Sequence, residues 1–313
     1  MSHIAFVFPG QGSQAKGMGK GLCDSFLEAR SVFEEADRAL GFPVSQLCFE
    51  GPEDRLQLTE NTQPAILAVS VAASRVLSAK GIQPYYLAGH SLGEYSALVA
   101  ANSLSLADAL RTVRNRGKYM QEAVPVGQGA MAAILGLSEA QVADLCEEAR
   151  RDEVLSPANL NSPVQIVIAG SVAAVHRALE LAKARGAKKA VLLPVSAPFH
   201  CRLMQSAQER LSQDLAHIRF QNLEVPLINN ADVAELRCGA QVAESLSRQV
   251  CAPVRWTETV QKLIGLGIRV FVEVGPGKVL CGLVRQIDKT MQTAHVEDLK
   301  SLNEALAILG HQN

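Results

Sequence analysis

The 313-residue sequence lacks the features that mark membrane, secreted and nucleic-acid-binding proteins. No stretch approaches the roughly 20 apolar residues of a membrane helix. The first apolar run, at 4–8, stops at Pro9 with no basic segment before it, so we expect no signal peptide. Thirty basic residues balance 31 acidic ones, for a formal net charge of −1. We therefore expect no nucleic-acid or membrane partner, and any anionic ligand must meet a local site.

The sequence also lacks the patterns of disulfide, metal and nucleotide sites. Its seven cysteines form no CxxC pair and are odd in number, as expected for reduced thiols in the cytoplasm. It has no HExxH motif, no His/Cys cluster at ligand spacing and no GK[ST]. Gly10, Gly12 and Ala15 fit a GxGxxA dinucleotide fingerprint, but 24–40 predicts an amphipathic helix where that fingerprint needs a second strand. We therefore expect no metal and no resident cofactor.

What the sequence does have is the alternation of apolar runs and amphipathic stretches that is typical of α/β proteins. Apolar residues make up 48% of the chain, enough for a sizeable core. The pattern predicts βαβ units on a parallel sheet. The expected elements are a strand at 4–8, helices over 22–40 and 63–80, a strand at 85–89, helices to about 122, and later a strand at 269–274 followed by the turn GPG and a final helix.

A second unit is predicted within the first. Residues 130–194 show the order strand, helix, strand, strand, helix, strand, which is the ferredoxin-like βαββαβ arrangement, after a loop rich in proline and glycine. We predict an α/β-hydrolase-like large catalytic subdomain with a parallel sheet, formed by 1–124 and 195–313. A ferredoxin-like small subdomain, 125–194, is inserted into it. Clefts between such units are favoured places for sites.

The segment YYLAGHSLGEYSALVAA places Gly89-His90-Ser91-Leu92-Gly93 between an apolar strand and a helix. This is the GxSxG nucleophile elbow in its required strand-turn-helix context. The two glycines leave room for a tight turn that presents the serine hydroxyl at a helix start, where the Leu92 N–H can hold a developing oxyanion. The alternative is an ordinary glycine-rich turn.

Ser91 needs a base to become a nucleophile, and His200 has the most suitable position of the seven histidines. It follows VLLPVSAPF, where the chain re-enters the large subdomain, so it should line the cleft. His90 is a poor base for Ser91, because neighbouring strand residues point to opposite faces. His176 falls on the polar side of a predicted helix.

Arg116 suggests the substrate. In SLADALRTVRNRGKYMQEA it shares the apolar helix face with Ala109, Val113 and Met120 at i, i+4, i+7 and i+11. An inward cation needs an anionic partner, and arginine grips a carboxylate through two parallel hydrogen bonds. Either a substrate carboxylate or an internal Asp or Glu meets this need, and helix geometry alone leaves both open.

These residues resemble a known family. The motifs that carry the resemblance are FPGQGSQ (8–14), TQPAI (62–66), GHSLGEYSAL (89–98), NSPVQIVIAG (161–170), SAPFH (196–200), PVRW (253–256) and VGPG (274–277). Together they span nearly the whole chain in the expected order. The sequence is similar to the malonyl-CoA:acyl carrier protein transacylases of bacterial fatty acid synthesis.

The resemblance implies roles for particular residues. Ser91 is expected to be acylated and His200 to activate it, with the amides of Gln11 and Leu92 as the oxyanion hole. The resemblance assigns Arg116 to the malonyl carboxylate and the backbone carbonyl of Gln249 to orienting the His200 ring. Three further pocket residues follow from it: Gln63, Asn159 and Phe199, the last as the variant that accepts malonyl.

The implied reaction is ping-pong transfer of malonyl from malonyl-CoA to the phosphopantetheine thiol of acyl carrier protein, through a seryl-malonyl intermediate. Phosphopantetheine belongs to the carrier, and a cytoplasmic monomer is the expectation. Three alternatives stay open: a serine hydrolase, a binding-only partner of a synthase complex, and an acyltransferase of polyketide assembly. Arg185, Lys188 and Lys189 form a basic cluster that either docks the carrier or is a solvated helix end.

Overall fold

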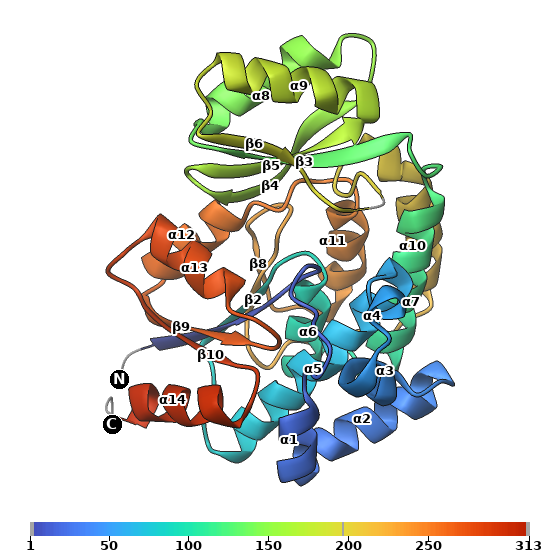
Figure 1. Cartoon of the computed structure of the whole chain (residues 1–313). Helices are drawn as coiled ribbons and strands as arrows, with labels where there is room; N and C mark the ends of the chain where they lie inside the picture. Colours follow the sequence, from blue (N-terminus) through green and yellow to red (C-terminus); the bar gives the residue numbers. More distant parts are fainter. Residues whose placement is uncertain (1–2, 196, 311–313) are drawn as a thin grey trace.

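The computed structural model describes residues 3–195 and 197–310, which form two sheets with helices around them (Figure 1). The larger sheet has the strand order β10-β9-β1-β2-β7-β8, and the smaller has β4-β5-β3-β6. The strands of the larger sheet are β1 (His3–Phe8), β2 (Tyr86–Gly89), β7 (Leu227–Ile228), β8 (Glu235–Leu236), β9 (Ile268–Val274) and β10 (Gln292–Val296). Those of the smaller are β3 (Gly129–Leu135), β4 (Leu155–Ser162), β5 (Gln165–Ser171) and β6 (Lys189–Leu192).

The larger sheet is parallel except for β8, which pairs antiparallel with β7. Helices cover both of its faces, as a parallel sheet requires, and β1 shows why: Phe6 and Phe8 pack into the core on one face, and Ala5 and Val7 into the core on the other. The helices of this part are α1 (Lys20–Ser25), α2 (Leu27–Leu40), α3 (Val44–Glu50), α4 (Glu53–Leu56), α5 (Thr59–Ala79), α6 (Gly93–Ala100), α7 (Leu106–Glu122), α10 (Gln205–Ala216), α11 (Val242–Gln249), α12 (Trp256–Gly265), α13 (Val279–Ile287) and α14 (Leu299–Gly310).

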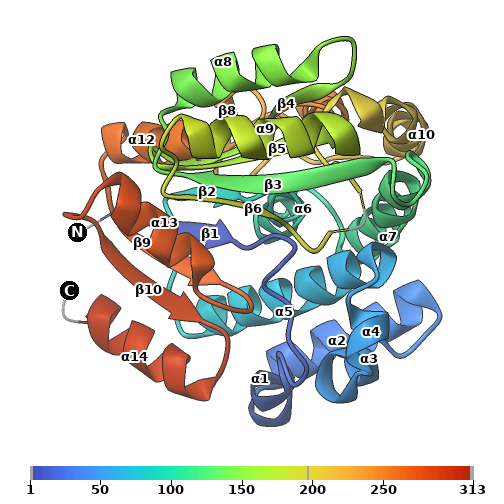
Figure 2. The same cartoon turned by 45° about the horizontal axis from the view of Figure 1, so that its top comes forward.

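The smaller sheet is antiparallel, and its order is that of a ferredoxin-like unit. Its helices α8 (Glu139–Arg150) and α9 (Val172–Ala184) lie on the side away from the large sheet (Figures 1 and 2). Side chains of β3 alternate between the two faces of this sheet: Ala132 and Ile134 pack under these helices, whereas Met131 packs into the core of the large subdomain. The predicted fold class, an α/β-hydrolase-like large part with an inserted ferredoxin-like part, is confirmed.

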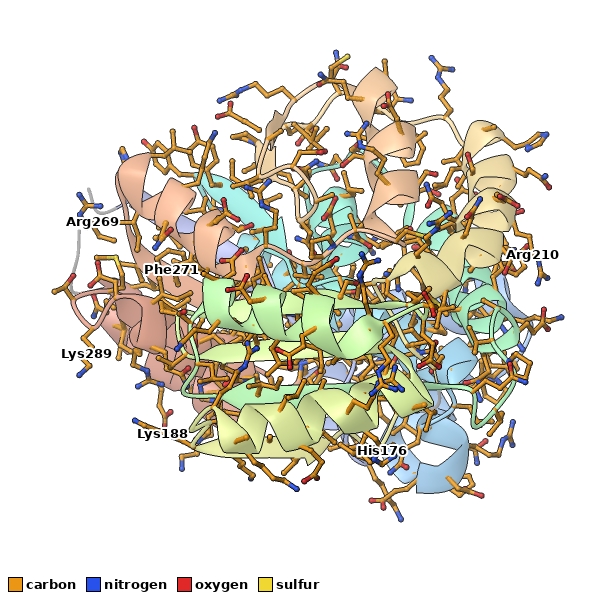
Figure 3. All side chains as sticks on the ribbon, turned by 90° about the horizontal axis from the view of Figure 1, so that it is seen from above. His176, Lys188, Arg210, Arg269, Phe271 and Lys289 are labelled. Carbon is orange, nitrogen blue, oxygen red and sulfur yellow. The ribbon has the colours of Figure 1, made fainter. Side chains whose placement is uncertain are left out.

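Backbone contacts fix the small sheet to the large part. The N–H of Leu160 donates to the carbonyl of Val254 at 2.9 Å, and the N–H of Val254 donates to the carbonyl of Ala158 at 2.8 Å. On the outer side, His176 and Lys188 are exposed, as Figure 3 shows from above. The polar position predicted for His176 is confirmed.

Three details differ from the sequence-based expectation. The amphipathic stretch 22–40 is two helices, because Phe26 takes an extended conformation (φ −129°, ψ 130°) and packs partly buried against the core. The GPG turn is followed by a helix, the strand β10 and a second helix, rather than one final helix. Strands β7 and β8 were not predicted, since two residues each are too few to show a period.

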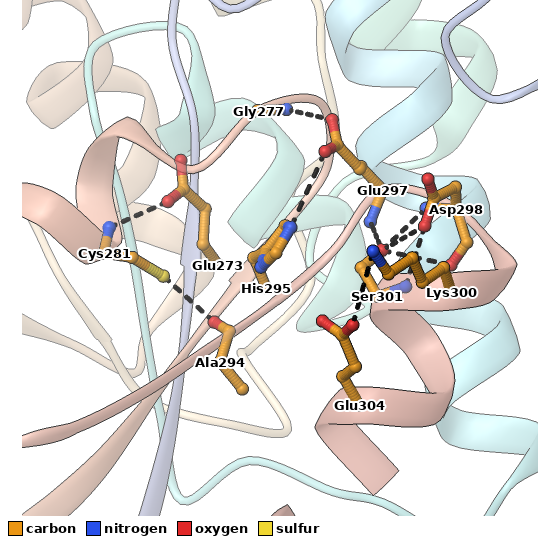
Figure 4. A network of polar contacts seen from close by, with 10 residues as sticks. All are labelled: Glu273, Gly277, Cys281, Ala294, His295, Glu297, Asp298, Lys300, Ser301 and Glu304. Atoms are coloured by element: carbon orange, nitrogen blue, oxygen red, sulfur yellow. Dashed lines mark hydrogen bonds and ion pairs between the residues drawn. The ribbon is translucent and has the colours of Figure 1, made fainter.

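The C-terminal part is held by a polar network around the turn 274–277 (Figure 4). Buried Glu273 accepts from the Cys281 N–H at 2.8 Å, and Glu297 accepts from the Gly277 N–H at 2.7 Å. A side chain at Gly275 would lie 2.3 Å from Ser70 Oγ and 3.0 Å from Pro9 Cγ. Glycine therefore lets this turn pack directly against the start of the loop after β1. None of the helices in the described ranges is long and apolar enough to cross a membrane.

Candidate active site

Ser91 lies on a sharp turn between β2 and α6, at the carboxyl end of the parallel sheet. Its φ is +52°, a left-handed conformation that non-glycine residues rarely adopt. The glycines on either side make the turn possible. A Cβ on Gly89 would lie 1.9 Å from the Gly93 carbonyl carbon, and one on Gly93 would lie 2.0 Å from the Phe8 oxygen. The GxSxG spacing is therefore a requirement of packing.

His200 approaches Ser91 from the segment that follows the small subdomain. Its Nε2 lies 2.7 Å from Ser91 Oγ, and its Nδ1 lies 3.0 Å from the Gln249 carbonyl oxygen and 3.2 Å from that of Ala252. Carbonyl oxygens only accept, so Nδ1 must carry the proton of a neutral ring. Nε2 is then free to accept from the serine hydroxyl, which is the arrangement of a nucleophile and its base.

The ring is neutral because of where it lies. His200 is buried, and burial followed by the nearby charge of Arg116 lowers the pKa of His200 to about 3. A base whose pKa is that low stays unprotonated across the neutral range. The carbonyl of Gln249 lies where the resemblance puts it, against Nδ1, in the place that a carboxylate takes in a Ser-His-Asp triad.

Arg116 points inward from α7 and is 2% exposed. One terminal nitrogen, Nη1, donates to Gln63 Oε1 at 2.8 Å, and the other, Nη2, donates to Ser91 Oγ and Gln249 Oε1, both at 3.0 Å. No described carboxylate lies within 4.0 Å of it as an ion-pair partner. The internal salt bridge that the helix geometry left open is thus absent from the described residues, and a buried cation faces the nucleophile.

Gln11 and Leu92 lie on two loops that meet at Ser91. Leu92 follows it directly at the start of α6, and Gln11 belongs to the loop after β1, which passes so close that a Cβ on Gly10 would lie 2.6 Å from the His90 oxygen. The side chain of Gln11 donates to Thr59 at 3.2 Å. The backbone N–H groups of Gln11 and Leu92 donate to no other described residue. Both are therefore available to an oxyanion.

A cavity of about 1060 Å³ opens between the two subdomains at Ser91. It brings together all the site residues proposed from the sequence except Gln249, which lies behind Arg116. The described residues leave Asn159 Oδ1 buried without a hydrogen-bond partner, and Phe199 forms part of the apolar wall. The lining set shared with the prediction is Gln11, Gln63, Ser91, Leu92, Arg116, Asn159, Phe199 and His200.

His90 also lines the cavity, but its ring turns elsewhere: Nε2 lies 2.8 Å from Asn161 Oδ1 on β4. Burial lowers the pKa of His90 as well. The contact ties the elbow to the small subdomain, which agrees with the view that His90 is not the base for Ser91.

Sequence reasoning missed two fully buried residues behind the nucleophile, Glu94 and Asn230. Glu94 Oε2 accepts from Gln249 Nε2 at 2.9 Å and from the Asn230 N–H at 3.0 Å. Burial raises the pKa of Glu94 to about 7. Glu94 had a signal, since it is the one charged residue in the mostly apolar stretch GEYSALVA. Asn230 had none, because it follows a strand of only two residues.

Among the described residues no group of three or more His, Cys, Asp or Glu side chains could hold a metal ion. The site is instead a serine hydroxyl beside a neutral histidine, with free backbone donors at a helix start and a buried arginine. On this fold, such a site defines a serine-dependent acyl-transfer enzyme. The chain belongs to the family described as "Acyl transferase domain", whose model matches residues 5–306.

Individual relatives are similar over their whole length. The malonyl CoA-acyl carrier protein transacylase of Bacillus subtilis is 46% identical over 314 residues, which cover 100% of this chain and 99% of the relative. The solved structure of that transacylase from Coxiella burnetii has a TM-score of 0.96 at 45% identity, covering 98% of this chain and 97% of that one. A malonyl-transacylase in complex with a type II PKS acyl-carrier protein has a TM-score of 0.95 at 46% identity, covering 98% and 99%.

Proposed function

We propose that this chain transfers the malonyl group of malonyl-CoA to the phosphopantetheine thiol of acyl carrier protein, as the names of its full-length relatives indicate for them. The observation that carries the proposal is the pairing of Arg116 with Ser91: a buried guanidinium lies 3.0 Å from the nucleophilic oxygen. Such a cation favours an acyl group that carries its own negative charge.

The short distance also limits the length of the acyl group. A carboxylate bound by Arg116 must lie close to the carbonyl carbon that Ser91 attacks, since one guanidinium nitrogen touches the serine oxygen itself. Malonyl separates its two carbonyl carbons by a single methylene and suits this distance. An uncharged acetyl group gives the buried cation no anionic partner, so the charge stays uncompensated, which is costly.

The first half-reaction begins at His200. Its Nε2 takes the proton of Ser91 Oγ as that oxygen attacks the thioester carbonyl, and the Gln11 and Leu92 N–H groups hold the resulting oxyanion. As the tetrahedral intermediate collapses, the carbon–sulfur bond breaks, and the CoA sulfur leaves with the proton from Nε2. The Gln249 carbonyl stabilises the imidazolium through Nδ1–H. Malonyl is then an ester on Ser91.

The second half-reaction runs the same steps in reverse with a different thiol. His200 takes the proton of the carrier's phosphopantetheine thiol, and the sulfur attacks the seryl ester. Collapse of this intermediate returns the proton to Ser91 Oγ and releases malonyl-carrier. The proposed steps use side chains and backbone donors of one chain, so we propose a monomer without a resident metal or cofactor. We also propose that it acts in the cytoplasm. The solved complex of a similar malonyl-transacylase with its carrier supports this partner.

Incubation with malonyl-CoA, with and without holo-carrier protein, tests the proposal. We expect malonyl-carrier, detected by intact mass, to form in step with CoA release, and little free malonate. Replacement of His200 by alanine should abolish transfer. Malonate that accumulates while the carrier stays unloaded would contradict the proposal and identify a hydrolase instead.

A further inference from the structure

The conformation of Ser91 needs support from outside the elbow. A non-glycine residue at φ +52° is strained by roughly 1–2 kcal/mol, and such strain persists only when the surroundings determine the conformation. The flanking glycines permit the turn, and the Gly93 N–H closes it on the His90 carbonyl at 2.9 Å, but no described backbone group of the elbow holds the Ser91 N–H. Further selecting contacts come from residues packed behind the turn.

The side chain of Asn230 supplies them on both sides of His90. Its Oδ1 accepts from the Ser91 N–H at 2.7 Å, and its Nδ2 donates to the Gly89 carbonyl at 2.6 Å. The backbone ladder between β2 and β7 ends one step earlier, with Ala88 opposite Ile228. One amide side chain thus continues the pairing past the last backbone pair and bridges the Gly89 carbonyl and the Ser91 N–H.

Asn230 is itself fixed from every side. It is 0% exposed, its backbone N–H donates to Glu94 Oε2 at 3.0 Å, and its carbonyl accepts from the Arg255 N–H at 3.2 Å. Glu94 in turn accepts from Gln249 Nε2, and the same nitrogen donates to the Ser91 carbonyl at 3.1 Å. The Ser91 N–H is therefore held by a side chain that the mechanism does not use, and the Ser91 carbonyl accepts from both the Gln249 side chain and the Glu94 N–H, each at 3.1 Å.

We propose that Asn230 is a positioning residue for acyl transfer, which sets the Ser91 turn so that Oγ meets His200 Nε2 and the oxyanion donors together. The inference rests on the proposed function. Asn230 acts by fixing the position of Ser91 and takes no part in the chemistry. Without its amide, Ser91 can relax from φ +52° toward an ordinary conformation, and Oγ moves relative to the Leu92 N–H. A displacement of about 1 Å can cost 10²-fold in rate.

A merely structural role predicts something different. If Asn230 only satisfied buried backbone groups, its loss would lower stability while each folded molecule still acylated normally. Asn229 offers a matched control, because it is also buried and its side chain makes three hydrogen bonds, to Asp232, Ser245 and the Ala234 N–H, none of which reaches the elbow. Removal of either amide should lower the melting temperature, but only loss of Asn230 should slow the chemistry.

The experiment is rapid-mix intact-mass analysis of the seryl-malonyl adduct over a range of malonyl-CoA concentrations, at a temperature where circular dichroism shows each protein folded. We expect Asn230→Ala to lower the maximal acylation rate by about 10²-fold with the half-saturating concentration changed less than threefold. Asn229→Ala should stay within threefold of wild type in both. An acylation rate for Asn230→Ala within threefold of wild type would overturn the proposal, as would an equal loss in Asn229→Ala.

A second variant covers the case in which Asn230→Ala does not fold. Asn230→Asp keeps the shape and the acceptor toward the Ser91 N–H, but places an oxygen instead of Nδ2–H against the Gly89 carbonyl. Slowed acylation with this variant supports the proposal, and an unchanged rate overturns it. The wild-type protein distinguishes failure of the proposed function from failure of the positioning role. If wild type forms no adduct, the proposed acyl transfer is wrong. If wild type forms the adduct and the Asn230 variants form it at the same rate, only the positioning role is wrong.

Discussion

Replacement of Arg116 by alanine should change which acyl group the enzyme accepts. The guanidinium has two terminal nitrogens, Nη2 beside Ser91 Oγ and Nη1 beside Gln63 Oε1. Hydrogen bonds to a charged group contribute about 1.5–3 kcal/mol each. Loss of a two-point contact with the malonyl carboxylate should therefore cost about 3–6 kcal/mol. At about 1.36 kcal/mol per tenfold, kcat/KM for malonyl-CoA should fall by about 10²–10⁴-fold. Acetyl-CoA has no carboxylate to lose and should fall by about tenfold at most, through the missing contact to Ser91 Oγ.

The informative quantity is the ratio of the two kcat/KM values, measured as CoA release in the presence of carrier protein. A general loss of structure lowers both values and leaves the ratio unchanged. Arg111→Ala is the control, because Arg111 lies on the same helix, is about half exposed and has Asp108 as its one ion-pair partner among the described residues. We expect the malonyl-to-acetyl ratio to fall at least tenfold in Arg116→Ala and to stay at the wild-type value in Arg111→Ala. An unchanged ratio in Arg116→Ala would refute the carboxylate role.

Three further predictions follow from charge and burial. Because the pKa of His200 is lowered to about 3, kcat/KM of Glu94→Gln, which removes the other group that titrates near neutrality, should be flat from pH 5 to 8. A histidine of ordinary pKa would lose about fourfold by pH 6, so an inflection near pH 6.5 in Glu94→Gln would contradict this. Burial raises the pKa of Glu94 to about 7 from about 4.5, so the folded state holds a proton that the unfolded chain loses. The unfolding free energy of wild type, measured in urea, should therefore fall by about 3 kcal/mol more than that of Glu94→Gln as pH rises from 4.5 to 7, and parallel curves would refute the shift. Lys188 and Lys189 are exposed without a described ion-pair partner, while Arg185 pairs with Glu148. If the two lysines dock the carrier, reversing both charges should raise the KM for carrier several-fold at low salt and leave the KM for malonyl-CoA unchanged. An unchanged KM for carrier would mean that the two lysines are solvated surface residues with no part in docking.

The parts of the fold that sequence predicted are those with a clear period. Strand β1 alternates between two cores, and the helices and strands of the small subdomain each run for four residues or more. The break at Phe26 could not be predicted, because the apolar period continues through it. Strands β7 and β8 could not be predicted either, since the pairing of β7 with β2 and of β8 with β7, and not local preference, defines them.

The same contrast holds at the site. Ser91 and Arg116 could be proposed from local patterns, since a tight turn and a helix face leave traces in the sequence. His200 could be proposed only because it lies where the chain re-enters the large subdomain. Gln249 was proposed from the resemblance alone, because a backbone carbonyl that accepts from a histidine leaves no sequence pattern. Asn230 was missed for a related reason: its contacts cross 139 and 141 residues, and only the folded chain brings the partners together.

The central claim is that Ser91 carries malonyl between two thiols, and the most direct test is the intact mass of the protein after brief exposure to malonyl-CoA and then to holo-carrier. We predict a single malonyl adduct that is absent from Ser91→Ala, is far weaker with acetyl-CoA, and disappears as the carrier gains the same mass. An adduct that persists in Ser91→Ala, or one that the carrier does not remove, would contradict the account.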